Sequence, residues 1–266
     1  MLSQKDVLQS RGTGATFKEL SKSRAADIRI PLPPLDEQRR IAAILDEVRD
    51  SLHALQQQIQ VLLRLPSLLL GELFKFSEKR RLDEIAMVGT GATPSRKNAA
   101  FYQGDIPWVK TTEVKGTIIT ETEEKISVGA LESSTCKLNR AGSSVVAMYG
   151  QGATRGRAGY LGIEAATNQA CAVVTPIDPI DDYFVYQCLL NSYEEIRGLG
   201  RGGTQPNLNL SLVRSFQIPY PSAELRGKIS KDLCSIENVV RKLRRRRDLL
   251  NELLESLSTR AFQGEL

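Results

Sequence analysis

Residues 30–62 read IPLPPLDEQRRIAAILDEVRDSLHALQQQIQVL, and residues 218–250 repeat the pattern at an offset of 188 positions. Each copy starts with Ile-Pro-x-Pro and continues with positions spaced alternately four and three residues apart, all apolar except Arg247. This spacing is typical of the a and d positions of a coiled coil. The sequence therefore predicts two related long helices that can pair. The predicted seam consists of Ile41, Leu45, Val48, Leu52, Leu55, Ile59, Leu62, Ile229, Leu233, Ile236, Val240, Leu243, Arg247 and Leu250.

The repeat divides the chain into four segments. Residues 35–76 and 221–266 hold the long helices, and residues 77–220 form a globular domain between them. Residues 1–34 have counterparts near the end of that domain at the same offset. These pairs are Thr16 and Thr204, Leu20 and Leu208, and Ile28 and Phe216. We expect residues 1–34 to be the remnant of a first globular domain.

The ends of the two helices follow from capping and breaking residues. Asp36 is the expected N-cap of the first helix, whose heptads run to Leu62. Pro66 is expected to kink or end that helix, leaving a short second piece that reaches about Phe74. The second helix is expected over residues 223–261.

The middle segment alternates short β-rich runs with glycine-containing turns. Strands are expected at residues 106–110, 144–149, 160–163 and 170–174, and a helical stretch at residues 181–198. This pattern favours an α+β domain with a strand-rich core. Trp108 is expected to lie in that core.

The composition is that of a globular chain. It has 266 residues, of which 41% are hydrophobic and 25% charged. We find no run of 18 apolar residues and no secretory signal, so we expect no membrane span and a cytoplasmic location. The four cysteines are far apart and are expected to be buried small hydrophobes. Because His53 is the only histidine, we expect no zinc site.

The net charge of +5 is not carried by the middle segment, where 15 basic residues balance 15 acidic ones. This balance argues against a DNA binder that works by electrostatics alone. The basic residues nevertheless gather in glycine- or threonine-rich stretches, so one basic face can contact phosphates. The run Arg244–Arg247 in the last helix is either a solvated helix face or a contact for DNA or an acidic partner.

Sequence motifs for catalysis are mostly missing. The chain has neither a phosphate-binding G-x-x-x-x-G-K-[ST] loop nor a G-x-S-x-G nucleophile motif. Residues 150–157, GQGATRGR, are similar to a dinucleotide loop but have one residue too many before the third glycine. The loop suits either a tight turn or a close approach to a DNA groove. Asp105, Glu113 and Lys115 leave open a Mg²⁺-dependent nuclease.

Several motifs resemble those of a known family. The motif-bearing stretches are residues 91–96, 102–110, 148–157 and 167–170. In this order they resemble a target recognition domain of the type I restriction–modification specificity subunit. Residues 30–41, IPLPPLDEQRRI, resemble the join between such a domain and the conserved spacer helix of the family.

The resemblance implies an α+β fold with one strand-rich target recognition domain and two long conserved helices in an antiparallel coiled coil. The family's subunit is non-catalytic and reads a split DNA site, one half with each of two recognition domains. It docks adenine-N6 methyltransferase subunits and a translocating endonuclease subunit. S-adenosylmethionine, ATP and Mg²⁺ are therefore expected on those partners and not on this chain. Because one recognition domain is complete in this sequence, a second copy of the chain is a further expected partner.

Residues that read bases differ between family members, so side-chain chemistry and loop context select the candidates. Hydroxyl and amide groups bond to base edges, and Arg and Lys bond to guanine or phosphate. The candidates are Thr93, Ser95, Arg96, Lys97, Lys110, Thr111, Gln151, Thr154, Arg155, Arg157, Arg201, Thr204 and Gln205. Two alternatives stay open beside the recognition subunit: the nuclease acting alone, and a coiled-coil scaffold without specific DNA binding.

Overall fold

The computed structural model describes residues 21–22, 26, 32–150, 152–200 and 208–265. It divides into two compact units. The helical unit comprises residues 1–63 and 237–266, and the globular unit comprises residues 64–236. Within the described residues, no helix is both long and apolar enough to cross a membrane.

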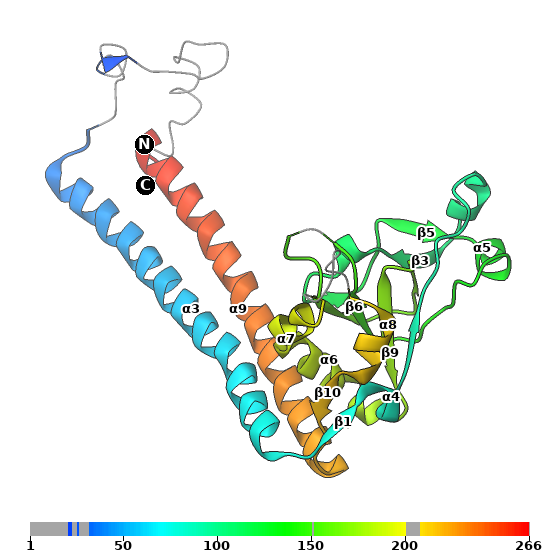
Figure 1. Ribbon diagram of the computed structural model, residues 1–266. Helices are drawn as coiled ribbons and strands as arrows, with labels where there is room; N and C mark the ends of the chain where they lie inside the picture. The colour runs from blue at the N-terminus through cyan, green and yellow to red at the C-terminus, as the bar shows by residue number, and fades with distance from the viewer. Residues whose placement is uncertain (1–20, 23–25, 27–31, 151, 201–207, 266) are drawn as a thin grey trace. The chain divides into compact units, whose positions relative to one another are not determined.

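Two long helices, each passing from one unit into the other, follow the sequence repeat. Helix α3 (Leu35–Phe76) has 42 residues and α9 (Ala223–Gln263) has 41, about 60 Å each. Their first residues, Leu35 and Ala223, are 188 positions apart, which is the offset of the sequence repeat. In the helical unit the two helices run antiparallel (Figure 1). All the predicted seam positions are buried or half-buried, including Arg247, which pairs with Asp248. The predicted seam positions therefore lie on the less exposed side of each helix.

The two helices also begin with the same local hydrogen bonds. The Gln38 side chain donates to the carbonyl of Pro33 (2.7 Å), and the Arg226 side chain donates to that of Pro221 (2.5 Å). The backbone N–H groups of the same two residues, Gln38 and Arg226, donate to the carbonyls of Pro34 and Ser222, both at 3.0 Å. The residues that form these bonds in the two copies are 188 positions apart, as in the seam. The repeat therefore includes the joints, which are the segments Pro33–Gln38 and Pro221–Arg226 where the helices begin.

Two predicted helix ends are wrong. Asp36 is not the N-cap, because the Pro34 carbonyl already accepts the first helical hydrogen bond. Pro66 does not end the first helix, which continues unbroken to Phe76. Proline removes one N–H donor, but apolar burial on both sides, at Ile59 and Leu70, favours the continuous helix.

The globular unit contains three sheets. Antiparallel pairing joins β2 (Ala86–Thr90), β9 (Cys171–Pro176), β6 (Ser144–Ala147) and β7 (Ala158–Leu161), and β4 (Ile118–Ile119) adds to β7 in parallel. The second sheet has the order β5 (Glu124–Ile126), β3 (Ile106–Val109), β8 (Ala166–Thr167). The third pairs β1 (Lys79–Arg81) with β10 (Gln217–Pro219). The α+β prediction is confirmed.

Short helices complete the globular unit. They are α4 (Leu82–Ile85), η2 (Ala99–Tyr102), η3 (Thr111–Glu113), α5 (Val128–Glu132), η4 (Pro179–Asp181), α6 (Asp182–Asn191), α7 (Tyr193–Gly198) and α8 (Leu210–Ser215). The largest core cluster packs α6 against the five-stranded sheet and includes Leu70 of α3 and Ile229 and Leu233 of α9. The C-terminal end of α3 and the N-terminal end of α9 are therefore part of the core of the globular unit.

Buried side chains bear on two of the sequence predictions. Trp108 is buried, and its indole N–H donates to the carbonyl of Ala92 at 3.1 Å, so its core role is confirmed. Three of the four cysteines are buried as expected. Cys234 is exposed, because its position on α9 faces away from the core positions Ile229 and Leu233.

A buried ion pair joins α9 to the domain. The Arg226 guanidinium donates to both carboxylate oxygens of Asp181, at 2.6 and 3.1 Å. Tyr220 donates its hydroxyl to the same carboxylate at 2.6 Å, and its ring lies 3.7 Å from the guanidinium carbon. Arg226 and Asp181 are only 6% and 1% exposed. We call these three residues the anchor triad.

The anchor triad predicts a pH dependence at alkaline pH. Burial and the hydrogen bond with Asp181 raise the pKa of Tyr220 to about 12, from 10.0. The folded state therefore favours the neutral phenol, and this stabilisation is present below pH 10 and lost between pH 10 and 12. We expect Tyr220→Phe to make the unfolding free energy fall less steeply over that range. Denaturant titrations from pH 9 to 12 measure the slope, with the exposed Tyr149→Phe as control. Equal slopes in the Tyr220→Phe and wild-type proteins would contradict the assignment.

Candidate functional site

The strand order gathers several loops at one end of the five-stranded sheet. Thr90, the last residue of β2, lies opposite Ala172, and Ala147, the last residue of β6, lies opposite Cys171. The loops that follow β2 and β6 and the one that precedes β9 therefore share one end. The loop after β3 reaches the same end, because Asn168 donates its backbone N–H to the carbonyl of Val109. We call this set of loops the loop face. All the described candidate residues lie on it.

One part of the loop face carries a tightly paired charge cluster. Arg96 donates to Glu124 at 2.6 Å and stacks over Tyr102, with its guanidinium carbon 4.0 Å from the ring centroid. Lys110 contacts Glu123 and Glu124, each at 2.9 Å. The bonds from Arg96 and then Lys110 lower the pKa of Glu124, so this carboxylate stays charged and neutralises part of both cations. Ser95 and Lys97 are exposed beside it, and Thr111 begins η3.

The hairpin loop between β6 and β7 carries the second group of candidates. Thr154, Arg155 and Arg157 are half-buried. The Nε atom of Arg155 is buried and has no hydrogen-bond partner among the described residues. Unlike Arg96, neither arginine forms an ion pair with a described carboxylate. Their cationic groups are therefore the less neutralised of the two sets.

Glycines and a neighbouring helix shape this hairpin loop. Gly150, Gly152 and Gly156 have φ values of 147°, 60° and 86°, which side chains with a Cβ rarely adopt. Tyr193 of α7 donates its hydroxyl to the Ala153 carbonyl at 2.9 Å. The loop joins two antiparallel strands and is not followed by a helix. It therefore lacks the helix N-terminus on which dinucleotide sites rely.

Four predicted residues, Gln151, Arg201, Thr204 and Gln205, lie outside the described part of the chain. Leu208, the first described residue after them, donates its N–H to the Met148 carbonyl at the start of the β6–β7 loop.

Sequence reasoning missed two residues of the loop face. Gln169 accepts a hydrogen bond from the Thr93 hydroxyl and ties the loops before β9 and after β2 together. Glu124 holds both Arg96 and Lys110. Its position in the acidic stretch 121–124 was visible, but the pairing depends on β3 and β5 lying side by side, with Trp108 opposite Glu124.

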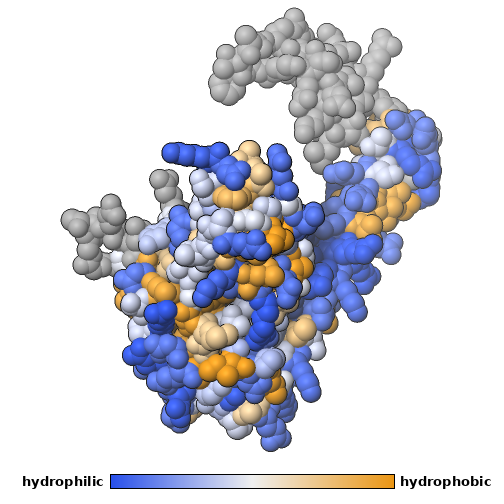
Figure 2. Space-filling model, turned by 90° about the vertical axis from the view of Figure 1, so that its right-hand side faces the viewer, coloured by the Kyte–Doolittle hydropathy of each residue, from blue (hydrophilic) through white to orange (hydrophobic). Residues whose placement is uncertain are grey.

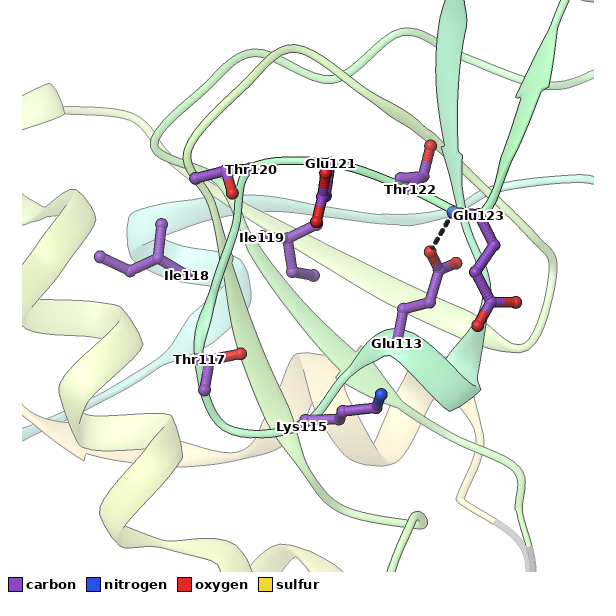
Figure 3. A pocket seen from close by; sticks show the side chains of 9 residues that line it. All are labelled: Glu113, Lys115, Thr117, Ile118, Ile119, Thr120, Glu121, Thr122 and Glu123. Atoms are coloured by element: carbon purple, nitrogen blue, oxygen red, sulfur yellow. Dashed lines mark hydrogen bonds between the residues drawn. The ribbon is translucent and has the colours of Figure 1, made fainter. Parts of the chain in front are cut away.

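The nuclease alternative rests on Asp105, Glu113 and Lys115, and two of these, Glu113 and Lys115, line a pocket together with residues 117–123 (Figure 3). One oxygen of Glu113 accepts the Glu123 N–H and the other accepts the Lys110 N–H, both at 2.8 Å. The carboxylate is therefore used to hold the turn. Asp105 does not line this pocket. Across the described residues, no cluster of three metal-ligating side chains occurs. The geometry thus gives the nuclease alternative no support.

The model of one protein family, described as "Type I restriction modification DNA specificity domain", matches residues 1–64 and 75–252. These residues cover most of the chain. The chain belongs to this type I specificity family. The resemblance that we inferred from the motifs and the joint at residues 30–41 is thereby confirmed.

Named relatives agree with the family assignment. The HindI specificity subunit of Haemophilus influenzae is 28% identical over 71% of this chain and 41% of its own length. The MjaIX specificity subunit of Methanocaldococcus jannaschii is 24% identical over 73% of this chain and 45% of its own length. The chain therefore spans less than half the length of each of these two relatives.

Solved structures of specificity subunits share the fold. The S subunit from M. genitalium matches with a TM-score of 0.64 and 17% identity, over 98% of this chain and 70% of its own. The HsdS subunit from Thermoanaerobacter tengcongensis matches with a TM-score of 0.61 and 19% identity, over 100% of this chain and 68% of its own. At these identities the likeness shows the fold alone, which in this chain is one mixed helix-and-sheet domain with two long helices.

Proposed function

We propose that this chain is the DNA-recognition part of a type I restriction–modification system and that its loop face reads one half of a split DNA site. Family membership and the convergence of the candidate polar residues on that one face support the proposal. The arginines of the β6–β7 loop have the chemistry for guanine edges, and the exposed polar side chains around them have the chemistry for phosphates.

The long helices support docking of two like partner subunits. Val61 and Leu65 are 61% and 39% exposed on adjacent turns of α3. At the repeat offset, Leu249 and Leu253 of α9 are 57% and 44% exposed. Apolar side chains that are exposed on adjacent turns form a continuous apolar strip, and large contiguous apolar patches mark protein interfaces. We propose that each pair contacts one adenine-N6 methyltransferase subunit, and that the endonuclease subunit joins the assembly through them.

The chain itself is proposed to be a specificity subunit without catalytic activity, working in the cytoplasm. S-adenosylmethionine, ATP and Mg²⁺ would be bound by its partners.

The proposal is tested by co-purifying the chain with its methyltransferase subunit and methylating a randomised duplex library. We expect methylated adenines to lie in an enriched motif when the library is sequenced. A symmetric split motif would indicate that two copies of the chain pair, each reading one half. Methylation without sequence preference by a stable complex would contradict the proposed recognition role.

A further inference from the structure

A groove on the globular unit reaches the loop face only at Gly91 and has no role in the proposed reading of DNA. It encloses about 940 Å³ between β2, β9, α8 and the segment 135–140. Hydrophilic side chains are interleaved with apolar surface on the face drawn in Figure 2. In the groove itself, three large apolar side chains are exposed to solvent: Met87 (69%), Ile177 (69%) and Leu138 (47%).

The charges that line the groove all have one sign. Lys137, Arg140 and Arg214 contribute to its walls, and no lining residue is acidic. Arg140 is balanced by Asp182, at 2.5 and 2.7 Å. Arg214 instead donates to the Val88 carbonyl, at 3.0 and 3.2 Å, while nearby Asp83 is held by Arg81. Of the three cations that line the groove, Lys137 and Arg214 are therefore the two without an ion pair to a described carboxylate.

The shape of the groove permits close approach by another chain. A Cβ atom on Gly89 in its floor would have no heavy atom within 4 Å, so the backbone of β2 is open at this point. The Arg214 side chain donates to the outward-facing carbonyl of Val88. This carbonyl is therefore not free to accept a hydrogen bond from a partner strand at the edge of β2. A partner segment would therefore bind through its side chains.

We propose that this groove docks a segment of the methyltransferase subunit in which apolar side chains lie beside carboxylates. The inference rests on the proposed function. Apolar partner side chains would cover Met87, Ile177 and Leu138, and partner carboxylates would pair with Lys137 and Arg214. Duplex DNA is the less suitable occupant, because protein–DNA interfaces are highly polar and would leave these three apolar side chains without partners.

Binding of the purified methyltransferase subunit to groove variants tests the proposal. The double variant Met87→Glu/Ile177→Glu should bind about tenfold more weakly than the wild-type chain, because it places carboxylates against the apolar and acidic segment. Lys137→Glu should weaken binding severalfold, with a smaller salt dependence. Both exposed controls, Val128→Glu on α5 and Lys125→Glu on β5, should bind within twofold of wild type.

Further measurements separate the possible outcomes. Thermal melts should match wild type, because the substituted side chains are exposed. A photo-crosslinker placed at position 87 should label a methyltransferase peptide that contains Asp or Glu. Unchanged methyltransferase binding by the double variant, or a loss of DNA binding in its place, would overturn the groove assignment alone. If the wild-type chain bound no methyltransferase subunit, the proposed function and this inference would both be wrong.

Discussion

Replacing Arg226 by alanine is expected to lower the free energy of unfolding by about 3–5 kcal/mol, the typical loss when one partner of a buried ion pair is removed. The Asp181 carboxylate would lose its guanidinium partner in a site where it is 1% exposed. The Tyr220 hydroxyl would be its remaining partner within the anchor triad. Because the triad fastens α9 to the domain core, the expected loss is several times larger than the loss from breaking an exposed ion pair.

Urea titration at neutral pH measures this effect. The matched control is Arg49→Ala, which removes an exposed pair with Asp46 (3.2 Å) and should change the free energy by less than about 1 kcal/mol. The double variant Asp181→Leu/Arg226→Met should recover much of the loss, because apolar replacements leave no buried charge. Equal losses in Arg226→Ala and Arg49→Ala would contradict the structural role of the triad.

Replacing Arg155 and Arg157 together by alanine is expected to reduce the affinity for the recognised DNA about 100-fold. Each good arginine contact with a base is worth about 1–3 kcal/mol, and neither side chain is neutralised by a described carboxylate. Arg96→Ala should cost much less, severalfold at most, because Glu124 already holds that guanidinium at 2.6 Å. The Arg96→Ala variant therefore serves as the control for the Arg155→Ala/Arg157→Ala variant.

The measurement is a DNA-binding titration at several salt concentrations, with the motif found by methylation sequencing and an unrelated duplex as competitor. The Arg155→Ala/Arg157→Ala variant should lose its preference for the motif, whereas Arg96→Ala should keep it. A thermal melt checks that the hairpin variant is folded. If Arg96→Ala caused the larger loss of preference, the loop around Arg96 and not the β6–β7 loop would be the reader.

The helical part of the fold could be predicted closely because its pattern is local and repeated. The seam from Ile41 to Leu62, like its second copy, depends on residues three and four apart, and both rows are buried or half-buried as expected. The effect of Pro66 could not be predicted from local rules. Whether one missing N–H ends a helix depends on what packs at Ile59 before it and at Leu70 after it.

The composition of the sequence indicated which residues are candidates for the site, but it could not indicate their hydrogen-bond partners. The described candidates, chosen from glycine-rich and threonine-rich stretches, lie in loops at one end of the sheet. These partners could not be predicted, because Glu124 is 28 positions from Arg96 in the sequence and Gln169 is 76 positions from Thr93. Such contacts require the strand order β5-β3-β8 and the β2–β9 pairing. The pairing of strands that are far apart in the sequence thus decides that Arg96 and Lys110 are already neutralised, and a short stretch of sequence does not contain that information.

The matched joints at Pro33–Gln38 and Pro221–Arg226 have a consequence for how this architecture can diversify. Each helix start is stabilised by its own short-range hydrogen bonds, which depend on about six residues of chain. A segment inserted between two such joints can change its loops and its sequence while the helix starts keep their bonds. The architecture therefore separates a segment that can change, between the two joints, from the two helix starts, which keep their own bonds.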